Sequence, residues 1–313
     1  MRRLILALSC FIVSASAMAA PQFINILTGG TSGVYYPLGV GLSQIYGKVM
    51  PDAKATVQAT KASVENLNLL QDGKGEVAFA LGDSVSDAWK GNTEAGFKAP
   101  LTKLRAIGGI YSNYIQIIAR TDANIKTLAD LKGKRVSVGA AKSGTELNTR
   151  EILKAAGMSY KDMGKVEYLG YAESVDLLKN RQLDATLQSS GLGAAFVKDL
   201  AASVDITIVA IPVDVAKKID DAAYLSAVIP KDTYAKQTAD VPTVAIRNML
   251  VTSEAVPEEV VYKMTKAMFE NLPQLVASHS AAKDIDRATA AQNLPIPLHP
   301  GAIRYYKEVG VLK

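Results

Sequence analysis

The sequence predicts an α/β protein of two domains. Segments typical of strands alternate along the chain with segments whose apolar residues recur at helical spacing, a pattern that indicates α/β layers with mostly parallel strands. Removal of a 19-residue leader would leave 294 of the 313 residues, which is enough for two domains. No later segment is apolar over a membrane-spanning length, so we expect no direct membrane insertion of the mature chain.

The first residues have the order of an export signal. Arg2 and Arg3 form a basic start, and Leu4–Val13 forms a short apolar core. Ala17-Met18-Ala19 has the small-x-small pattern of a signal-peptide cleavage site. The apolar core is too short to span a bilayer as a stable helix. We expect cleavage after Ala19, so that residues 1–19 are a signal peptide and the mature chain is periplasmic.

The only cysteine, Cys10, lies inside this leader. Cleavage would leave no thiol, which excludes disulfides, thiolate catalysis and cysteine metal sites together. An exported protein without disulfides fits the bacterial periplasm. The alternative is a lipid anchor on Cys10, but the preceding residues Ala7-Leu8-Ser9 fit that signal poorly.

Charge and histidine content exclude further classes. Loss of Arg2 and Arg3 lowers the formal net charge from +5 to +3, and no block of five basic residues suggests nucleic-acid binding. The two histidines, His279 and His299, have no second imidazole or carboxylate at ligand spacing. We therefore expect no metal, no cofactor and no catalytic residues.

Ten segments are predicted to be strands, and helical periods lie between many of them, for example at Val64, Leu67 and Leu70. The predicted strands are Phe23–Leu27, Ala55–Gln58, Val77–Leu81, Leu104–Ile107, Ile115–Ala119, Val136–Gly139, Val166–Leu169, Ala185–Gln188, Ile206–Ala210 and Leu225–Ile229.

A glycine-rich run, residues 28–37, separates the first strand from the first helix. Strand, glycine-rich turn and helix is the geometry that directs backbone N–H groups at an anion. Thr31 and Ser32 add hydroxyls, and Tyr35 and Tyr36 can supply an apolar wall with a polar tip. The alternative is a plain turn with Pro37 starting the helix, since neither nucleotide-binding glycine pattern is present.

Other helix boundaries have clear signals. Ser63 stands at the expected start of one helix, where its side chain can serve as the N-cap. Ser143 and Glu146 have the spacing of a capping box, and Gly157 is a suitable stop. Pro257, followed by two glutamates, begins another helix in a favoured way.

Several of these motifs coincide with those of one known family. The runs TGGTSGVYYPLG (28–39), SVENLNLL (63–70), DLKGKRVSVGAAKSGTE (130–146), DVPTVAIRNMLV (240–251), TKAMFENL (265–272) and PIPLHPGAIRYYKEVG (295–310) occur in that family's order. They cover nearly the whole mature chain. The sequence resembles the TAXI family of solute-binding proteins, which serve TRAP-type transporters.

The resemblance implies a type II periplasmic-binding-protein fold with two α/β lobes joined by a hinge. Residues 20–113 and 230–313 would form lobe I and residues 114–229 lobe II, with crossings near Tyr111–Gln116 and Tyr224–Pro230. The resemblance also implies a small carboxylate such as glutamate or 2-oxoglutarate as ligand, and a TRAP permease, driven by an ion gradient, as partner. We expect a monomer that takes a small anionic solute and no nucleic acid.

Candidate ligand residues in lobe I follow predicted strands, because crevices form at the carboxyl ends of strands. The candidates between Thr31 and Tyr36 match the family's glycine-rich signature. Those between Thr60 and Asp83 follow the next two predicted strands, where Lys61 and the segment Leu81–Asp83 depart from the family pattern. Asp83 could accept from a ligand amine or cap the following helix, and Lys61 could pair with a carboxylate or be a surface charge. These candidates are Thr31, Ser32, Gly33, Tyr35, Tyr36, Thr60, Lys61, Ser63 and Asp83.

In lobe II, Ser143, Gly144 and Thr145 match the family's Ser-Gly-Thr, where a helix start offers N–H donors and hydroxyls to a carboxylate. Capping alone would also explain Ser143. Gln188 is a further candidate, and Glu173, Ser174 and Arg120 are weaker ones.

Two other classes of function remain open from the sequence. A two-lobed binding protein of this kind could instead be a sensory receptor that docks on a membrane histidine kinase. A kinase gene, rather than a permease gene, beside this one would indicate that role. An exported enzyme on this fold is the third possibility, against which stands the lack of a catalytic constellation.

Overall fold

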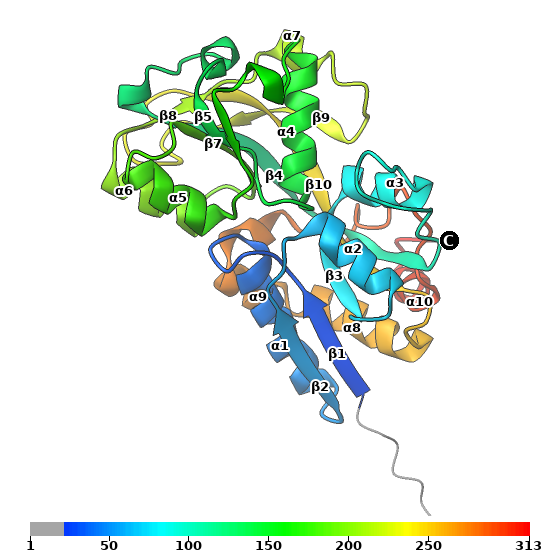
Figure 1. Ribbon diagram of the computed structural model, residues 1–313. Helices are drawn as coiled ribbons and strands as arrows, with labels where there is room; N and C mark the ends of the chain where they lie inside the picture. The colour runs from blue at the N-terminus through cyan, green and yellow to red at the C-terminus, as the bar shows by residue number, and fades with distance from the viewer. Residues whose placement is uncertain (1–21) are drawn as a thin grey trace, which may run out of the picture.

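The computed structural model describes residues 22–313, which form two lobes that meet at a narrow waist (Figure 1). The predicted signal peptide and Cys10 lie outside these residues. No helix within the described part of the chain is both long and apolar enough to cross a membrane.

Strands and helices alternate as the sequence predicts. The strands are β1 (Gln22–Leu27), β2 (Ala53–Gln58), β3 (Val77–Leu81), β4 (Leu104–Arg120), β5 (Arg135–Ser137), β6 (Lys165–Glu167), β7 (Ala185–Ser190), β8 (Ile206–Val209), β9 (Tyr224–Ile229) and β10 (Val241–Ser253). The helices are α1 (Tyr35–Val49), α2 (Ser63–Gln71), α3 (Gly82–Lys90), α4 (Gly144–Ala155), α5 (Tyr171–Lys179), α6 (Ala195–Ser203), α7 (Val213–Ala216), α8 (Glu258–Glu270), α9 (Leu272–Ser278) and α10 (Pro300–Glu308).

Each lobe is built from its own set of elements. In Figure 1, lobe I holds β1–β3 with α1–α3 and α8–α10, and lobe II holds α4–α7 with β5, β7, β8 and β9. The two ends of the described residues, Gln22 and Lys313, therefore both belong to lobe I. Buried aliphatic and aromatic side chains form the core, among them Leu38, Leu42 and Ile45 on one face of α1.

One ten-stranded sheet runs through both lobes in the order β2-β1-β3-β10-β4-β7-β5-β6, with β8 on β4 and β9 on β10. The prediction of mostly parallel strands is wrong: β1–β2, β1–β3, β5–β6 and β5–β7 are parallel, and the other five pairings are antiparallel. The reason is that β4 and β10 run in opposite directions and pair with strands of both lobes.

These two long strands are the connection at the waist. β4 leaves lobe I and enters lobe II, and β10 pairs first with β9 and then, from Asn248 on, with β3. The division into lobes at residues 113 and 230 stays a proposal. The pairings favour a second crossing inside β10, near Arg247, over the predicted Tyr224–Pro230, because Val241–Ile246 still pairs with β9.

Local signals at helix ends are partly confirmed. Ser143 Oγ accepts a hydrogen bond from Glu146 N at 3.1 Å, and Gly157 follows α4 with a φ of 70°. The Glu146 carboxylate does not complete the capping box, because it pairs with Arg150 one turn later. The predicted cap at Ser63 is wrong: α2 has no side-chain cap, and Ser63 Oγ accepts from Leu81 N instead.

Candidate functional site

A small cavity lies between the two lobes. Its volume is about 20 Å³, which is room for about one water molecule. Lobe I contributes residues of α1, α2 and β3, lobe II contributes residues of α4, α5 and β7, and β4 forms part of the wall. The cavity is lined by Val34, Tyr35, Ala62, Ser63, Leu81, Tyr111, Asn113, Gly144, Thr145, Tyr171, Ser189 and Ser190.

Four helices begin at this cavity. Tyr35, Ser63, Gly144 and Tyr171 are the first residues of α1, α2, α4 and α5, and all four line it. The first N–H groups of a helix have no partner inside the helix, and its dipole places partial positive charge at that end. Four such ends directed at one space create a positive potential without any basic side chain.

None of the described residues that line the cavity is charged. Burial raises the pKa of Tyr171 to about 12, and burial holds the pKa values of Tyr35 and Tyr111 well above the ordinary value. All three phenols are therefore neutral at physiological pH, and the Tyr111 hydroxyl, which has no partner, is able to donate a hydrogen bond. Such a lining suits an anion, because nothing in it repels negative charge.

Three hydroxyls of the lining have no hydrogen-bond partner: those of Tyr111, Ser189 and Ser190. Each of these residues is at most 2% exposed. A buried hydroxyl without a partner costs free energy, so such groups in native proteins call for an explanation. A solute with acceptor oxygens would satisfy those of the three that face the cavity.

The remaining polar groups of the wall hold one another in place. Tyr35 donates to Asn248 Oδ1 at 2.5 Å, and Tyr171 donates to the Ser189 carbonyl at 2.5 Å. Thr145 Oγ1 lies 3.1 Å from the Tyr171 hydroxyl. These bonds fix the rings, so that the site is rigid before any ligand enters.

The lobes touch around the cavity at positions without side chains. A Cβ on Gly144 would lie 2.7 Å from both Ser63 Oγ and Leu81 Cδ1, which belong to lobe I. A Cβ on Gly33 would lie 3.0 Å from the Tyr171 ring. Glu65 N also donates to Lys142 O at 3.2 Å across the same interface. Glycine at these positions permits the lobes to close.

Four of the predicted ligand residues line the cavity: Tyr35, Ser63, Gly144 and Thr145. The rest of the glycine-rich run lies beside it. Thr31 is exposed, and Ser32 and Tyr36 are half-buried outside the lining, whereas Gly33 packs against Tyr171.

The other predicted residues have different surroundings. Thr60 hydrogen-bonds the Thr28 carbonyl and Asn66, and Lys61 is exposed. Ser143 caps α4, as described above. The buried Gln188 donates to Thr186 at 2.5 Å, while its Oε1 has no partner.

The weaker candidates of lobe II are committed elsewhere. Arg120 donates to Asp122 and to the Leu183 carbonyl, which leaves it no clamp for a ligand. Glu173 and Ser174 stabilise the start of α5, since Glu173 accepts from Gly170 N and Ser174 donates to Gly170 O.

The sequence interpretation did not identify eight of the lining residues, including Tyr111, Asn113, Ser189 and Ser190. Ser189 and Ser190 directly follow the predicted strand Ala185–Gln188, so the rule that selected Ser63 and Ser143 would also have found them. Tyr111 and Asn113 lie inside β4, in the middle of a strand, where that rule has no signal.

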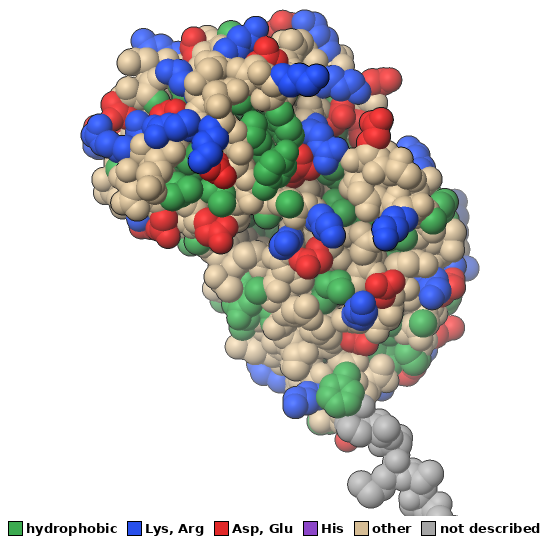
Figure 2. All heavy atoms as spheres, viewed as in Figure 1, with side chains coloured by type: hydrophobic (Ala, Val, Ile, Leu, Met, Phe, Trp, Pro, Cys, Tyr) green, Lys and Arg blue, Asp and Glu red, His purple; other side chains and the backbone are tan. Residues whose placement is uncertain are grey.

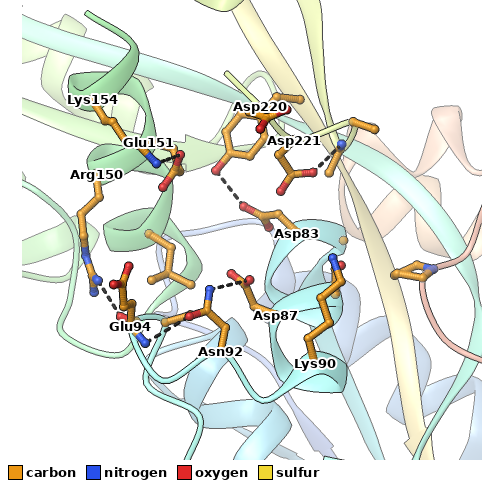
Figure 3. Close-up of a pocket in the computed structure, with 18 of the residues that line it drawn as sticks. Asp83, Asp87, Lys90, Asn92, Glu94, Arg150, Glu151, Lys154, Asp220 and Asp221 are labelled. Carbon is orange, nitrogen blue, oxygen red and sulfur yellow. Dashed lines mark hydrogen bonds and ion pairs between the residues drawn. The ribbon is translucent and has the colours of Figure 1, made fainter. Parts of the chain in front are cut away.

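A much larger groove, of about 1400 Å³, lies on the other side of the contact between α3 and α4 (Figure 3). Charged side chains of both signs line it, and many of them are paired. Arg150 pairs with Glu146, Lys154 with Glu151, and Arg247 donates to the carbonyls of Thr289 and Gln292. Three of its five cations thus have partners, and its carboxylates, such as Asp87 and Asp221, would repel an anion, so we place the candidate site in the cavity.

The visible face of the molecule also mixes both signs of charge over both lobes, without one large patch of either (Figure 2). Within residues 22–313, no group of three or more His, Cys, Asp and Glu side chains is placed to hold a metal ion.

Comparison with known proteins gives one family and many structures of the same architecture. Residues 26–310, nearly the whole described chain, match the family model described as the NMT1-like family.

Solved structures agree in fold. PhnD1 from Prochlorococcus marinus in complex with methylphosphonate has a TM-score of 0.57 at 10% identity, over 93% of this chain and 100% of that one. A putative L-cystine ABC transporter from Listeria monocytogenes has a TM-score of 0.51 at 16% identity, over 85% and 98%. XAC2383 from Xanthomonas citri bound to ATP has a TM-score of 0.50 at 13% identity, over 93% of this chain and 97% of that one. At these identities the likeness concerns the fold alone, and it confirms the predicted fold class, a periplasmic-binding-protein fold of two α/β lobes.

Proposed function

This chain belongs to the NMT1-like family, and we propose that it is a periplasmic solute-binding protein without enzymatic activity. It encloses a small anionic solute between its lobes and presents it to a membrane transporter. One observation carries the proposal: four helix N-termini and three unpartnered hydroxyls surround a cavity lined by no charged side chain.

Closure is the mechanism that this arrangement supports. The starts of α1 and α2 come from lobe I, and the starts of α4 and α5 come from lobe II together with Ser189, so only the closed form offers a solute all of these donors. A ligand that contacts both lobes shifts the population toward that form. Opening at the waist releases the solute.

The size of the cavity bears on the bound state. A volume of about 20 Å³ is too small for a carboxylate of several heavy atoms. We infer that the lobes stand further apart around the solute than they do here. The hydroxyls of Ser189 and Ser190 and the four helix starts would then lie at contact distance from the oxygens of the solute. A small carboxylate such as glutamate or 2-oxoglutarate stays our proposed ligand class.

The partner that we propose is a TRAP permease, on the strength of the sequence motifs. One structural relative is named as an ABC transporter, and that class is the competing partner. Uptake into membrane vesicles that contain the permease encoded beside this gene separates the two. Uptake driven by an ion gradient supports the TRAP partner, and uptake that requires ATP contradicts it.

Calorimetry on the mature chain tests the binding function. The protein is first unfolded and refolded to remove any solute that co-purifies. Glutamate, 2-oxoglutarate and methylphosphonate are then compared with neutral amide or ester analogues of the same size. We expect at least one anion to bind and to raise the melting temperature by about 5 °C or more at saturation, by mass action.

The neutral analogues serve as the matched control. Because the donors are arranged for negative charge, a neutral analogue should bind at least tenfold more weakly than its acid. Equal affinity for acid and amide, or no binding by any anion of a broader panel, would contradict the proposed function.

A further inference from the structure

A buried carboxylate joins the lobes outside the cavity. Asp83 is the second residue of α3 in lobe I and is only 3% exposed. It borders the large groove, whereas Leu81, two residues earlier, lines the cavity. Figure 3 shows Asp83 directed toward residues of lobe II across the groove.

Both partners of one carboxylate oxygen come from lobe II. Asn148 Nδ2 on α4 donates to Asp83 Oδ2 at 2.7 Å, and the Tyr224 hydroxyl on β9 donates to the same oxygen at 2.8 Å. Asn148 Nδ2 also lies 2.8 Å from the Tyr224 hydroxyl, which closes a three-membered cluster. The other oxygen accepts from Ser84 N at 2.6 Å within α3. Separation of the lobes must break the first two bonds and expose the carboxylate to the groove.

The charged groups that face Asp83 do not neutralise it. Asp221, on the turn before β9, and Asp87, one turn later in α3, both act on it with like charge. The cations along the groove have other partners: Arg150 pairs with Glu146, and Arg247 donates to backbone carbonyls. The Lys90 side chain, at the end of α3, acts on Asp87.

From this geometry we propose that Asp83, Asn148 and Tyr224 form a latch between the lobes that is tightest when Asp83 is protonated, so that acid favours closure even without solute. The proposal rests on the proposed function, in that closure is the step that traps the solute. A protonated carboxyl still accepts from Asn148 and can exchange donor and acceptor roles with the Tyr224 hydroxyl.

The direction of the pH effect follows from burial. Desolvation in the closed form raises the pKa of Asp83 to about 7, against about 3.9 for a solvated aspartate in the open form. The closed form therefore binds the proton more tightly. Its extra stability is complete below pH 4 or so and is lost as the pH rises toward 7. The closure equilibrium should fall by up to about tenfold per pH unit in that interval, and no further above about pH 8.

Fluorescence energy transfer between the lobes measures this without any solute. Lys98 in lobe I and Lys217 in lobe II are exposed, and the mature chain has no other cysteine, so K98C and K217C can carry pH-insensitive dyes. We expect the closed population of the solute-free protein to rise from pH 8 to pH 5. Asp83→Asn should abolish this response, while the control Asp87→Asn, a neighbouring carboxylate on the same helix, should keep it.

A second variant keeps the test decisive if Asp83→Asn does not fold. Tyr224→Phe removes a hydrogen bond that lowers the pKa of Asp83, so the midpoint of closure should move to higher pH. A wild-type protein that shows no pH response, or an Asp83→Asn protein that responds as the wild type does, overturns the latch. Since the readout needs no ligand, a working latch in a protein that binds no anion would refute the proposed function alone.

Discussion

The cavity and the groove both lie between the lobes, yet their linings handle charge in opposite ways. The groove is about 1400 Å³ in volume and carries charged side chains of both signs, acidic ones among them. The cavity is about 20 Å³ and has no charged side chain, but four helix starts give it a positive potential. The comparison teaches why we propose the anion site from backbone orientation and unsatisfied hydroxyls rather than from volume or charged residues.

The largest effect should come from removing the paired serine hydroxyls. In Ser189→Ala combined with Ser190→Ala, each lost hydrogen bond to a charged solute weakens binding by about 1.5 kcal/mol or more, so affinity should fall about 100-fold or more. Calorimetry measures it, with Ser43→Ala, a hydroxyl that bonds the Val40 carbonyl on α1, as control. Unchanged affinity would move the site out of the cavity.

A methyl group at the lobe contact should have the next largest effect. Gly144→Ala places a Cβ within 2.7 Å of Ser63 and Leu81, and overpacking of this kind costs about 1–3 kcal/mol. Because the clash exists only when the lobes close as far as they do here, the closed population of the solute-free protein, measured by energy transfer between the lobes, should fall, whereas affinity for a solute that holds the lobes further apart should change little. Gly47→Ala on α1, where a Cβ meets nothing within 4 Å, is the matched control. A tenfold loss of affinity in Gly144→Ala would mean that the bound lobes close as far as they do here, which contradicts the wider bound form that we infer.

Tyr111→Phe should change affinity and stability in opposite directions. It removes a buried hydroxyl without a partner, so the solute-free protein should gain about 1 kcal/mol of stability while solute affinity falls by about as much. Tyr46 also has a buried, unpartnered hydroxyl but lies outside the cavity lining. Tyr46→Phe should therefore stabilise the protein and leave affinity unchanged. Thermal melts measure the stability of both variants, and calorimetry measures their affinity for the solute. Equal losses of affinity in the two variants would contradict a contact between Tyr111 and the solute.

The smallest effect should come from the groove. Lys90 and Lys161 line it and are exposed. Lys90→Ala and Lys161→Ala should each change solute affinity by less than about 0.5 kcal/mol, as usual for surface positions. A tenfold loss in either variant would show that the groove, and not the cavity alone, receives the solute.

Much of the fold could be predicted from the sequence because its elements have local signals. Apolar runs mark β1 and β3, alternation of apolar and polar residues marks β7, and Ser143 and Gly157 mark the ends of α4. The two strands at the waist lack such signals. β4 was predicted as two strands, since Gly108-Gly109 and Ser112-Asn113 are typical of a turn. β10 was not predicted at all, because Arg247 and Asn248 interrupt its apolar pattern.

The same cause explains what could be predicted of the candidate site. Residues at helix starts, such as Tyr35, Ser63 and Thr145, are visible in a strand–turn–helix pattern. Tyr111 and Asn113 reach the cavity only because β4 crosses between the lobes, and this arrangement is a property of the sheet rather than of neighbouring residues. Lys61 and Arg120 were selected for charge, which the cavity does not use.

The pairing of β4 with β10 has a mechanical consequence. The two strands are hydrogen-bonded to each other across the waist, with register shifts between Arg247 and Met249 and between Leu250 and Val251. Such a ribbon bends readily at its irregular points but resists sliding along its length, since sliding would break the whole ladder. In the closure that we propose, the lobes would therefore move by bending of this ribbon, and the helix starts on either side would return to the same alignment each time.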